Sequence, residues 1–357
     1  MAVLSEDQTM LRDMAREWAD NEAPVAALRR LRDSGSHGGY DAALWQAQAE
    51  MGWAGIIVPE AHGGAGMGHL SLGLVLEALG RNLSASPLAA TSAATSALML
   101  GGSEAQQAEW LPRIASGEVV AALAVDEGPV FAPGRIDARA ENGRLSGSKK
   151  FVAEGDTAQL FVVAAQDGLY LVPEGDGVTR AHRAMVDHRS HADLRFDNAP
   201  ADRLASGGAA LLSEVTDRAA AMTAAEMLGL AEAAFEMTND YLKTRVQFGQ
   251  KLSSFQALQH RMATWFTELQ LMRSAVEGAL EAIDAGRADI DQTVSLAKAI
   301  ASDTLHLSSR EIVQLHGGIG MTDDYDAGFF LKRARVLEAM WGNAAYHRER
   351  FARLNGY

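Results

Sequence analysis

Two segments about seventy residues apart carry side chains that could bind a phosphate-bearing ligand. The first is Arg245-Val246-Gln247-Phe248-Gly249, followed by Phe255-Gln256; the second is Gln314-Leu315-His316-Gly317-Gly318-Ile319-Gly320. A guanidinium binds phosphate oxygens with two parallel donors, and glycine lets the backbone approach a ligand closely. Phe248 could pack on a flat ring. Together, the two segments suit a large, polyphosphorylated, flat cofactor.

Each segment, taken singly, also has a simpler interpretation. An arginine four residues before Gly249 is typical of a helix C-terminus, where a cation is favourable and a glycine closes the helix. The Gly317-Gly318 pair can likewise end a helix, although it leaves amide groups free to bind a ligand. The presence of both segments in one chain, in this order, favours the cofactor interpretation.

Composition excludes several kinds of chemistry. The chain of 357 residues has no cysteine, so disulfides, thiolate catalysis and cysteine-ligated zinc or iron–sulfur centres are excluded. No spacing of histidines and carboxylates predicts a metal site. The formal net charge of −14 opposes binding to nucleic acid, so a phosphate site must be locally basic or rich in free amides.

The chain also lacks the signals of membrane proteins and secreted proteins. No run of 18 apolar residues occurs, so no membrane span is predicted. The first twenty residues are acidic and amphipathic, without the basic and then apolar order of a secretory signal. We therefore expect a cytoplasmic protein.

Periodicity divides the chain into three zones, which predict an α+β protein. Residues 1–118 predict an N-terminal helical domain, residues 119–205 a middle antiparallel β domain, and residues 206–357 a C-terminal four-helix bundle. The predicted strands are 119–125, 149–152, 160–164, 169–172 and 192–196, with turn signals between several of them. The predicted bundle helices are 214–247, 256–283, 290–315 and 332–354.

The order of these motifs resembles that of the acyl-CoA dehydrogenases, flavoenzymes that use FAD. That family carries Arg-x-x-Phe-Gly, Phe-Gln, Gln-x-x-Gly-Gly-x-Gly and then a basic helix, which match residues 245–249, 255–256, 314–320 and 332–335. Residues 52–60, 111–118 and 147–152 are also similar to family segments. The resemblance covers essentially the whole chain.

The resemblance implies an activity and a set of partners. The family desaturates acyl-CoA thioesters between the α and β carbons: a carboxylate base removes a proton, and a hydride passes to the flavin. It further implies FAD held between subunits of a homodimer or tetramer, electron-transfer flavoprotein as the electron acceptor, and a place in fatty acid or steroid side-chain catabolism.

The resemblance also implies which residues contact FAD. Arg245 and Phe248 would reach it from a neighbouring subunit, with Gln256 close by. Gln314, Gly317 and Gly318 would meet its pyrophosphate and adenosine side. Phe151 would lie at the isoalloxazine ring. Asn343 stands at the start of the family's usual Thr-Ala-Gln segment and is a further candidate contact.

The catalytic base is the point at which the sequence departs from the family. The usual glutamate before a glycine is replaced by Trp341, before Gly342, and the alternative base position falls at about Ala219. The candidate base is instead Glu226, which lies in an otherwise apolar helical stretch where a carboxylate is costly unless it is paired or useful. Glu226 could equally form an ion pair across the bundle. Asp217 and Glu338 are weaker candidates.

Two further interpretations therefore stay open. Some bacterial members of the family that act on steroid side chains consist of two homologous subunits, one of which supplies the base. This chain could be the base-less, catalytically silent subunit of such a heteromeric enzyme. It could also be a related flavin oxidase or monooxygenase.

Overall fold

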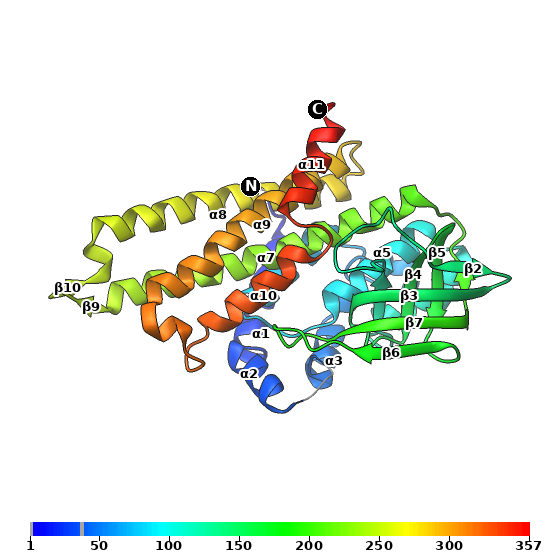
Figure 1. The fold of residues 1–357 in the computed structure, drawn as a ribbon, viewed down its shortest axis with the longest axis horizontal. Coiled ribbons are helices and arrows are strands. Elements are labelled where there is room, and N and C mark those ends of the chain that lie inside the picture. The colour runs from blue at the N-terminus through cyan, green and yellow to red at the C-terminus, as the bar shows by residue number, and fades with distance from the viewer. Residues whose placement is uncertain (1–2, 36–38) are drawn as a thin grey trace. The chain divides into compact units, whose positions relative to one another are not determined.

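A computed structural model describes residues 3–35 and 39–357 (Figure 1). Residues 1–2 and 36–38, which include the start of the predicted N-terminal domain, lie outside the described residues. Contacts divide the chain into two units: the first holds the residues up to Ala26, Gly73–Ser84 and Ala221–Tyr357, and the second holds Ala27–Leu72 and Ala85–Ala220. The N-terminal helices thus contribute to both units, and the three-domain division at 118/119 and 205/206 stays a prediction.

The N-terminal zone is helical, as its periodicity predicts. Its helices are α1 (Glu6–Glu22), α2 (Val25–Asp33), α3 (Ala42–Glu50), α4 (Gly68–Arg81), α5 (Leu88–Gly101) and α6 (Glu104–Ala115). Capping boxes begin two of them. The Ser5 and Ser103 side chains each accept a hydrogen bond from the backbone N–H three residues on, and the glutamine at that position accepts one from the backbone N–H of the serine.

The middle zone forms two sheets within the second unit. One has the order β1 (Ala121–Ala124), β4 (Leu160–Ala165), β5 (Gly168–Pro173), β8 (Asp202–Arg203). The other has the order β2 (Arg139–Glu141), β3 (Arg144–Ala153), β7 (His191–Pro200), β6 (Val178–His182). All neighbouring pairs are antiparallel except β1 and β4, which run parallel. Strands β1 and β4 are buried along their whole length, which explains their continuous apolar runs.

The C-terminal zone is the helical bundle. Its helices are α7 (Ala209–Thr244), α8 (Gln256–Asp284), α9 (Ile290–His316), α10 (Ala327–Ala339) and α11 (Ala344–Leu354). The prediction of one helix over 332–354 is wrong, because the chain turns sharply between α10 and α11. Trp341 adopts a left-handed φ of 55°, Gly342 follows with φ 96°, and the Asn343 side chain caps α11.

Buried charges join the helices of the first unit. The Arg273 guanidinium on α8 lies 2.9 Å from Glu77 on α4 and 2.5 Å from Glu232 on α7. Arg16 of α1 reaches the same Glu77 at 2.8 Å. Burial opposes ionisation of Glu77, but the hydrogen bonds and charges of Arg273 and Arg16 outweigh it and lower the pKa of that carboxyl. The network therefore ties four helices together through paired charges.

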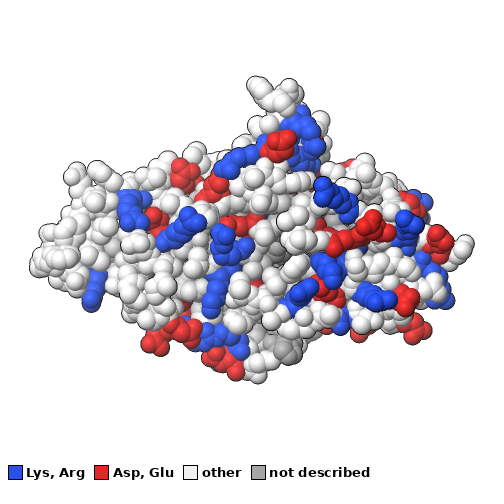
Figure 2. Space-filling model, in the orientation of Figure 1, with Lys and Arg blue, Asp and Glu red and all other residues white. Residues whose placement is uncertain are grey.

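This architecture confirms the predicted α+β class. Within the described ranges, no helix is long and apolar enough to cross a membrane. On the face drawn in Figure 2, acidic and basic side chains are interspersed rather than gathered into one basic tract.

Candidate functional site

The first signature segment forms a short hairpin that follows α7. Strand β9 (Val246–Gln247) pairs antiparallel with β10 (Gln250–Lys251), and Phe248 and Gly249 form the two-residue turn. Both turn residues have positive φ, 51° and 78°, the pattern of a type I′ turn. An aromatic residue in this conformation is strained. The turn leaves the Phe248 side chain 89% exposed, with its ring edge-on to Phe255 at 6.2 Å.

The polar residues of this segment are free to bind a ligand. The guanidinium of the exposed Arg245 makes no hydrogen bond or ion pair with any described residue. Gln256, the exposed first residue of α8, also has no such bond through its side chain within the described part. An exposed guanidinium without an acid partner presents five donors, which suits a phosphate.

The second signature segment forms the end of α9 and the turn η4 (Gly317–Met321). Gly317 has φ 63° and ψ −138°, a conformation that is essentially restricted to glycine. A side chain added at Gly317 or Gly318 would meet no atom within 4 Å, so both backbones border open space. Gln314 is exposed one turn earlier on α9. The segment therefore presents an amide side chain and an accessible backbone together.

A buried aromatic contact brings the two segments to the same end of the bundle (left in Figure 1). The His316 ring lies 4.4 Å from that of Tyr241, one turn before Arg245. His316 Nδ1–H donates to the Ile312 carbonyl at 2.7 Å, and Nε2 accepts from the Tyr325 hydroxyl at 2.9 Å. Burial lowers the pKa of His316, so the ring is neutral and structural.

These groups fit the cofactor that the sequence predicts. FAD presents a pyrophosphate and two flat ring systems, which require cationic or amide donors, close backbone approach and an exposed aromatic surface. The first unit supplies a guanidinium with no acid partner in the described ranges, two amides, an open glycine pair and an exposed phenylalanine. The chemistry of this donor set matches the group.

Phe151, the predicted isoalloxazine contact, lies in the second unit, where its backbone and its ring contact Asp193 and Arg183. It has φ 52°, and its backbone N–H donates to Asp193 Oδ1 at 3.2 Å. Arg183 lies 5.1 Å from the ring centre and pairs with the same carboxylate, as does Lys150 at 2.9 Å. Although burial opposes it, hydrogen bonding from Arg183 and Lys150 lowers the pKa of Asp193 to about 2. The sequence did not identify Asp193 or Arg183, which are distant from Phe151 along the chain.

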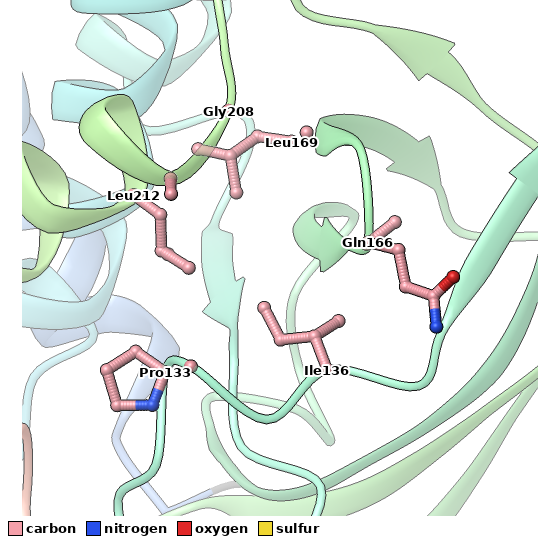
Figure 3. Close-up of a pocket in the computed structure, with 10 residues that line it drawn as sticks. Pro133, Ile136, Gln166, Leu169, Gly208 and Leu212 are labelled. Atoms are coloured by element: carbon pink, nitrogen blue, oxygen red, sulfur yellow. The ribbon is translucent and has the colours of Figure 1, made fainter.

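A cavity of ≈ 200 Å³ also lies in the second unit, and the sequence did not predict it (Figure 3). Three separate segments line it: the loop before β2, the β4–β5 turn and the start of α7. Figure 3 shows Pro133, Ile136, Leu169 and Leu212 around the space, with the Gln166 amide at one side. The cavity therefore has apolar lining side chains, with the Gln166 amide as a polar group among them.

Neither position that the resemblance predicts for the catalytic base holds a carboxylate. Trp341 occupies one, and Ala219 is buried at the other. Glu226, the predicted substitute, is buried, and both of its oxygens accept from Arg333 of α10: Nε to Oε1 at 2.8 Å and Nη2 to Oε2 at 2.9 Å. The structure thus shows the ion pair that the sequence left open. The role of Glu226 as a base stays a prediction.

The other sequence candidates are placed as follows. Asn343 is exposed, and its Oδ1 accepts from Tyr346 N at 3.0 Å. Asp217 is buried rather than solvated, and Glu338 accepts a hydrogen bond from Arg335 at 2.9 Å. No group of three metal-ligating side chains occurs in residues 3–35 and 39–357.

A histidine of α11 that contacts the turn after α10 affects stability through its protonation. His347 Nε2 donates to the Trp341 carbonyl at 2.9 Å. Burial, and then the charge of Lys298, lower the pKa of His347 to about 3. The unfolded chain binds this proton near pH 6.5, so stability is expected to fall as the pH drops from about 6.5 toward 3, by up to about 1.4 kcal/mol per pH unit.

Urea unfolding at pH 7, 6 and 5 measures this effect. His347→Gln retains an N–H donor but cannot be protonated, so its stability should depend less steeply on pH than that of the wild type. Equal slopes for the two proteins would contradict the assignment.

The sequence matches the acyl-CoA dehydrogenase N-terminal domain over residues 5–118 and its C-terminal domain over residues 206–354. This chain belongs to the acyl-CoA dehydrogenase family, whose members are FAD-dependent enzymes acting on CH–CH groups.

Individual relatives support the same assignment. The chain is 33% identical to the acyl-CoA dehydrogenase IpdE2 of Mycobacterium tuberculosis, covering 92% of this chain and 91% of that protein. It is 31% identical to the Tcur3481-Tcur3483 steroid ACAD, with a TM-score of 0.91 and 98% of each chain covered. The ChsE4-ChsE5 complex of Mycobacterium tuberculosis gives 27% identity and a TM-score of 0.92, with 100% of each chain covered.

Proposed function

We propose that this chain is the base-less subunit of a two-subunit, FAD-dependent acyl-CoA dehydrogenase that introduces an α,β double bond into a CoA thioester. In this assignment a homologous partner subunit supplies the carboxylate that removes the α proton. The chain itself contributes FAD-binding groups and completes the fold of the assembly.

The observation that carries this proposal is the absence of an available carboxylate at the family's base positions. Trp341 and Ala219 cannot accept a proton, and Glu226 has both oxygens bound by Arg333. A general base must reach the proton that it removes and must have a free lone pair directed at it. The similarity to the ChsE4-ChsE5 complex and to Tcur3481-Tcur3483 supports a partner subunit.

When bound, FAD supplies the hydride acceptor for the β carbon. For this chain we propose that Arg245 and Gln256 hold phosphate or ribose oxygens, with Phe248 packed on a ring. Gln314 and the Gly317-Gly318 backbone hold the pyrophosphate and adenosine side. Phe151 and Asn343 are two further proposed FAD contacts. The support is that these donors are exposed and that Arg245 has no acid partner within the described residues.

The cavity in Figure 3 gives a place for an apolar part of the substrate. The apolar side chains that line it suit a hydrocarbon group; they are Pro133, Ile136, Leu169 and Leu212. The Gln166 amide could form a hydrogen bond with a carbonyl or amide of the thioester arm. From the steroid ACAD relative we propose a steroid-derived CoA thioester as the substrate class. We further propose electron-transfer flavoprotein as the electron acceptor and a cytoplasmic location.

Co-purification tests the proposed assembly. The chain is co-expressed with a homologue that carries glutamate before its C-terminal glycine, and the mixture is separated by size-exclusion chromatography while flavin absorbance is recorded. We expect both chains in one peak that carries FAD. Separate elution of the two chains, or a joint peak without a flavin band, would contradict the proposal.

Replacing Arg245 tests the proposed cofactor contact. Arg245→Ala is expected to raise the Kd for FAD about 10- to 100-fold, because a hydrogen bond to a charged group contributes about 1.5–3 kcal/mol. Arg261→Ala is the matched control, since Arg261 is also an exposed arginine of the first unit but is already paired with Glu311 at 2.7 Å. Fluorescence titration with FAD gives both constants. Equal losses in the two variants would argue against a specific role for Arg245.

A further inference from the structure

A lysine lies fully buried inside the helical bundle, where no part of the proposed chemistry uses it. The Lys298 side chain on α9 has no exposed surface. Burial lowers its pKa to about 7, which reflects the cost of placing an ammonium group away from water. An apolar side chain could fill the same volume without that cost. The buried amino group therefore points to a structural element that it holds in place by hydrogen bonds.

What Lys298 holds is the turn between α10 and α11. Its Nζ donates to the carbonyl oxygens of Gly342 at 2.9 Å and Leu337 at 3.1 Å, and the Glu338 carbonyl lies at 3.4 Å. The last carbonyls of a helix have no partner within it, so one ammonium serves the end of α10 and the turn beyond. With His347 bonded to the Trp341 carbonyl, two buried side chains bind four carbonyls of residues 337–342.

The conformation of this turn requires such support. Trp341 has φ 55°, a left-handed conformation that is strained for a bulky residue and persists only where its surroundings enforce it. The turn directly precedes Asn343, whose side chain begins α11. Trp341 occupies the family's base position, and Asn343 is a proposed FAD contact. The turn thus fixes two residues of the proposed site.

We propose that Lys298 is a positioning residue: with His347, it clamps residues 337–343 in the one conformation that places Trp341 and Asn343 for the assembled FAD site. The clamp itself rests on geometry within the first unit. Its consequence for FAD rests on the proposed function.

Hydrogen–deuterium exchange tests the clamp without any cofactor. In Lys298→Met, which keeps a long apolar side chain, amide exchange over residues 338–347 is expected to rise at least about tenfold, because the segment loses the Nζ donor to its carbonyls. Ser308→Ala is the matched control: Ser308 is also buried on α9, but it accepts from Trp265 Nε1 at 2.7 Å and lies away from the turn. Its exchange at 338–347 should stay at the wild-type rate. Wild-type exchange in Lys298→Met would overturn the proposal.

A second pair of variants keeps the test decisive if Lys298→Met does not fold. His347→Leu removes the donor to the Trp341 carbonyl and should raise exchange at 340–347, whereas His347→Gln retains a donor and should restore protection. Failure of the glutamine to restore it would overturn the clamp.

The link to the cofactor is measured separately, in the assembly with its homologous partner. Lys298→Met should raise the Kd for FAD about tenfold, in step with the loosened turn. A loosened turn with unchanged FAD affinity would overturn the positioning role. Wild-type assemblies that bind no FAD would instead reject the proposed function and leave the exchange result standing.

Discussion

Purified without a partner and loaded with FAD, the chain is expected to keep its flavin oxidised when an acyl-CoA thioester is added anaerobically. In complex with a homologous subunit that carries the base, the same flavin band is expected to bleach about 10²- to 10⁴-fold faster. A positioned general base contributes about 10²–10⁴ to a proton transfer, and this chain offers no free carboxylate at the family's two base positions.

Stopped-flow absorbance near the flavin maximum measures both rates. The control is dithionite, which should reduce the flavin of the isolated chain fully and so show that the cofactor is bound and reducible. Substrate bleaching by the isolated chain at the rate of the complex would contradict the assignment. If Glu226→Gln then removed that bleaching, Glu226 would be the base that the sequence predicts.

Glu226→Gln is expected to reduce the free energy of unfolding by about 3 kcal/mol. Removing one partner of a buried ion pair leaves the other charge uncompensated, which typically costs about 3–5 kcal/mol, and the glutamine carbonyl recovers part of that loss. The Arg333 side chain is 11% exposed and its partner lies at 2.8 Å, so water cannot replace the carboxylate well. Urea unfolding followed by circular dichroism gives the difference.

Two further variants distinguish an ion pair from a catalytic residue. The double variant Glu226→Leu with Arg333→Met should lie within about 1.5 kcal/mol of the wild type, because replacing both charges by apolar groups removes the desolvation cost as well. Glu236→Gln is the control: Glu236 pairs with Arg81 but is 57% exposed, so a change within about 0.5 kcal/mol is expected. A stable Glu226→Gln protein would contradict the structural role.

The elements whose signal is local were predictable from the sequence. Helices α7, α8 and α9 follow long apolar periodicities, and their predicted bounds differ from the observed ones by a few residues. Strands β4 and β5 are continuous apolar runs joined at Asp167-Gly168, and their turn was predicted for that reason. The short strands β2, β6 and β8 were missed because their residues are mostly exposed and their pairing is set by β3, β5 and β7.

The break between α10 and α11 was missed for a different reason. The helical pattern runs across Trp341, and the side chain that hydrogen-bonds the turn there, Lys298, is far away in sequence. The same holds for Phe151, whose conformation depends on Asp193 and Arg183, and for the cavity in Figure 3, which three distant segments form.

A useful signal was nevertheless present in the sequence. Lys298 is flanked by small and apolar residues, Leu296-Ala297 and Ala299-Ile300, in the same way as Glu226. A charge in such a setting has to be buried with a partner, and both residues proved to be so. The sequence could mark the two positions, but it could not say whether each charge serves chemistry or packing.

Anaerobic bleaching of the assembled enzyme, with the carboxylates of its two subunits varied in turn, is the most direct test of the central claim. The account predicts that changing the partner subunit's glutamate to glutamine abolishes substrate bleaching, whereas Glu226→Gln in this chain leaves the bleaching rate of the folded complex unchanged. Bleaching that survives the partner's change and disappears with Glu226→Gln would show that this chain supplies the base.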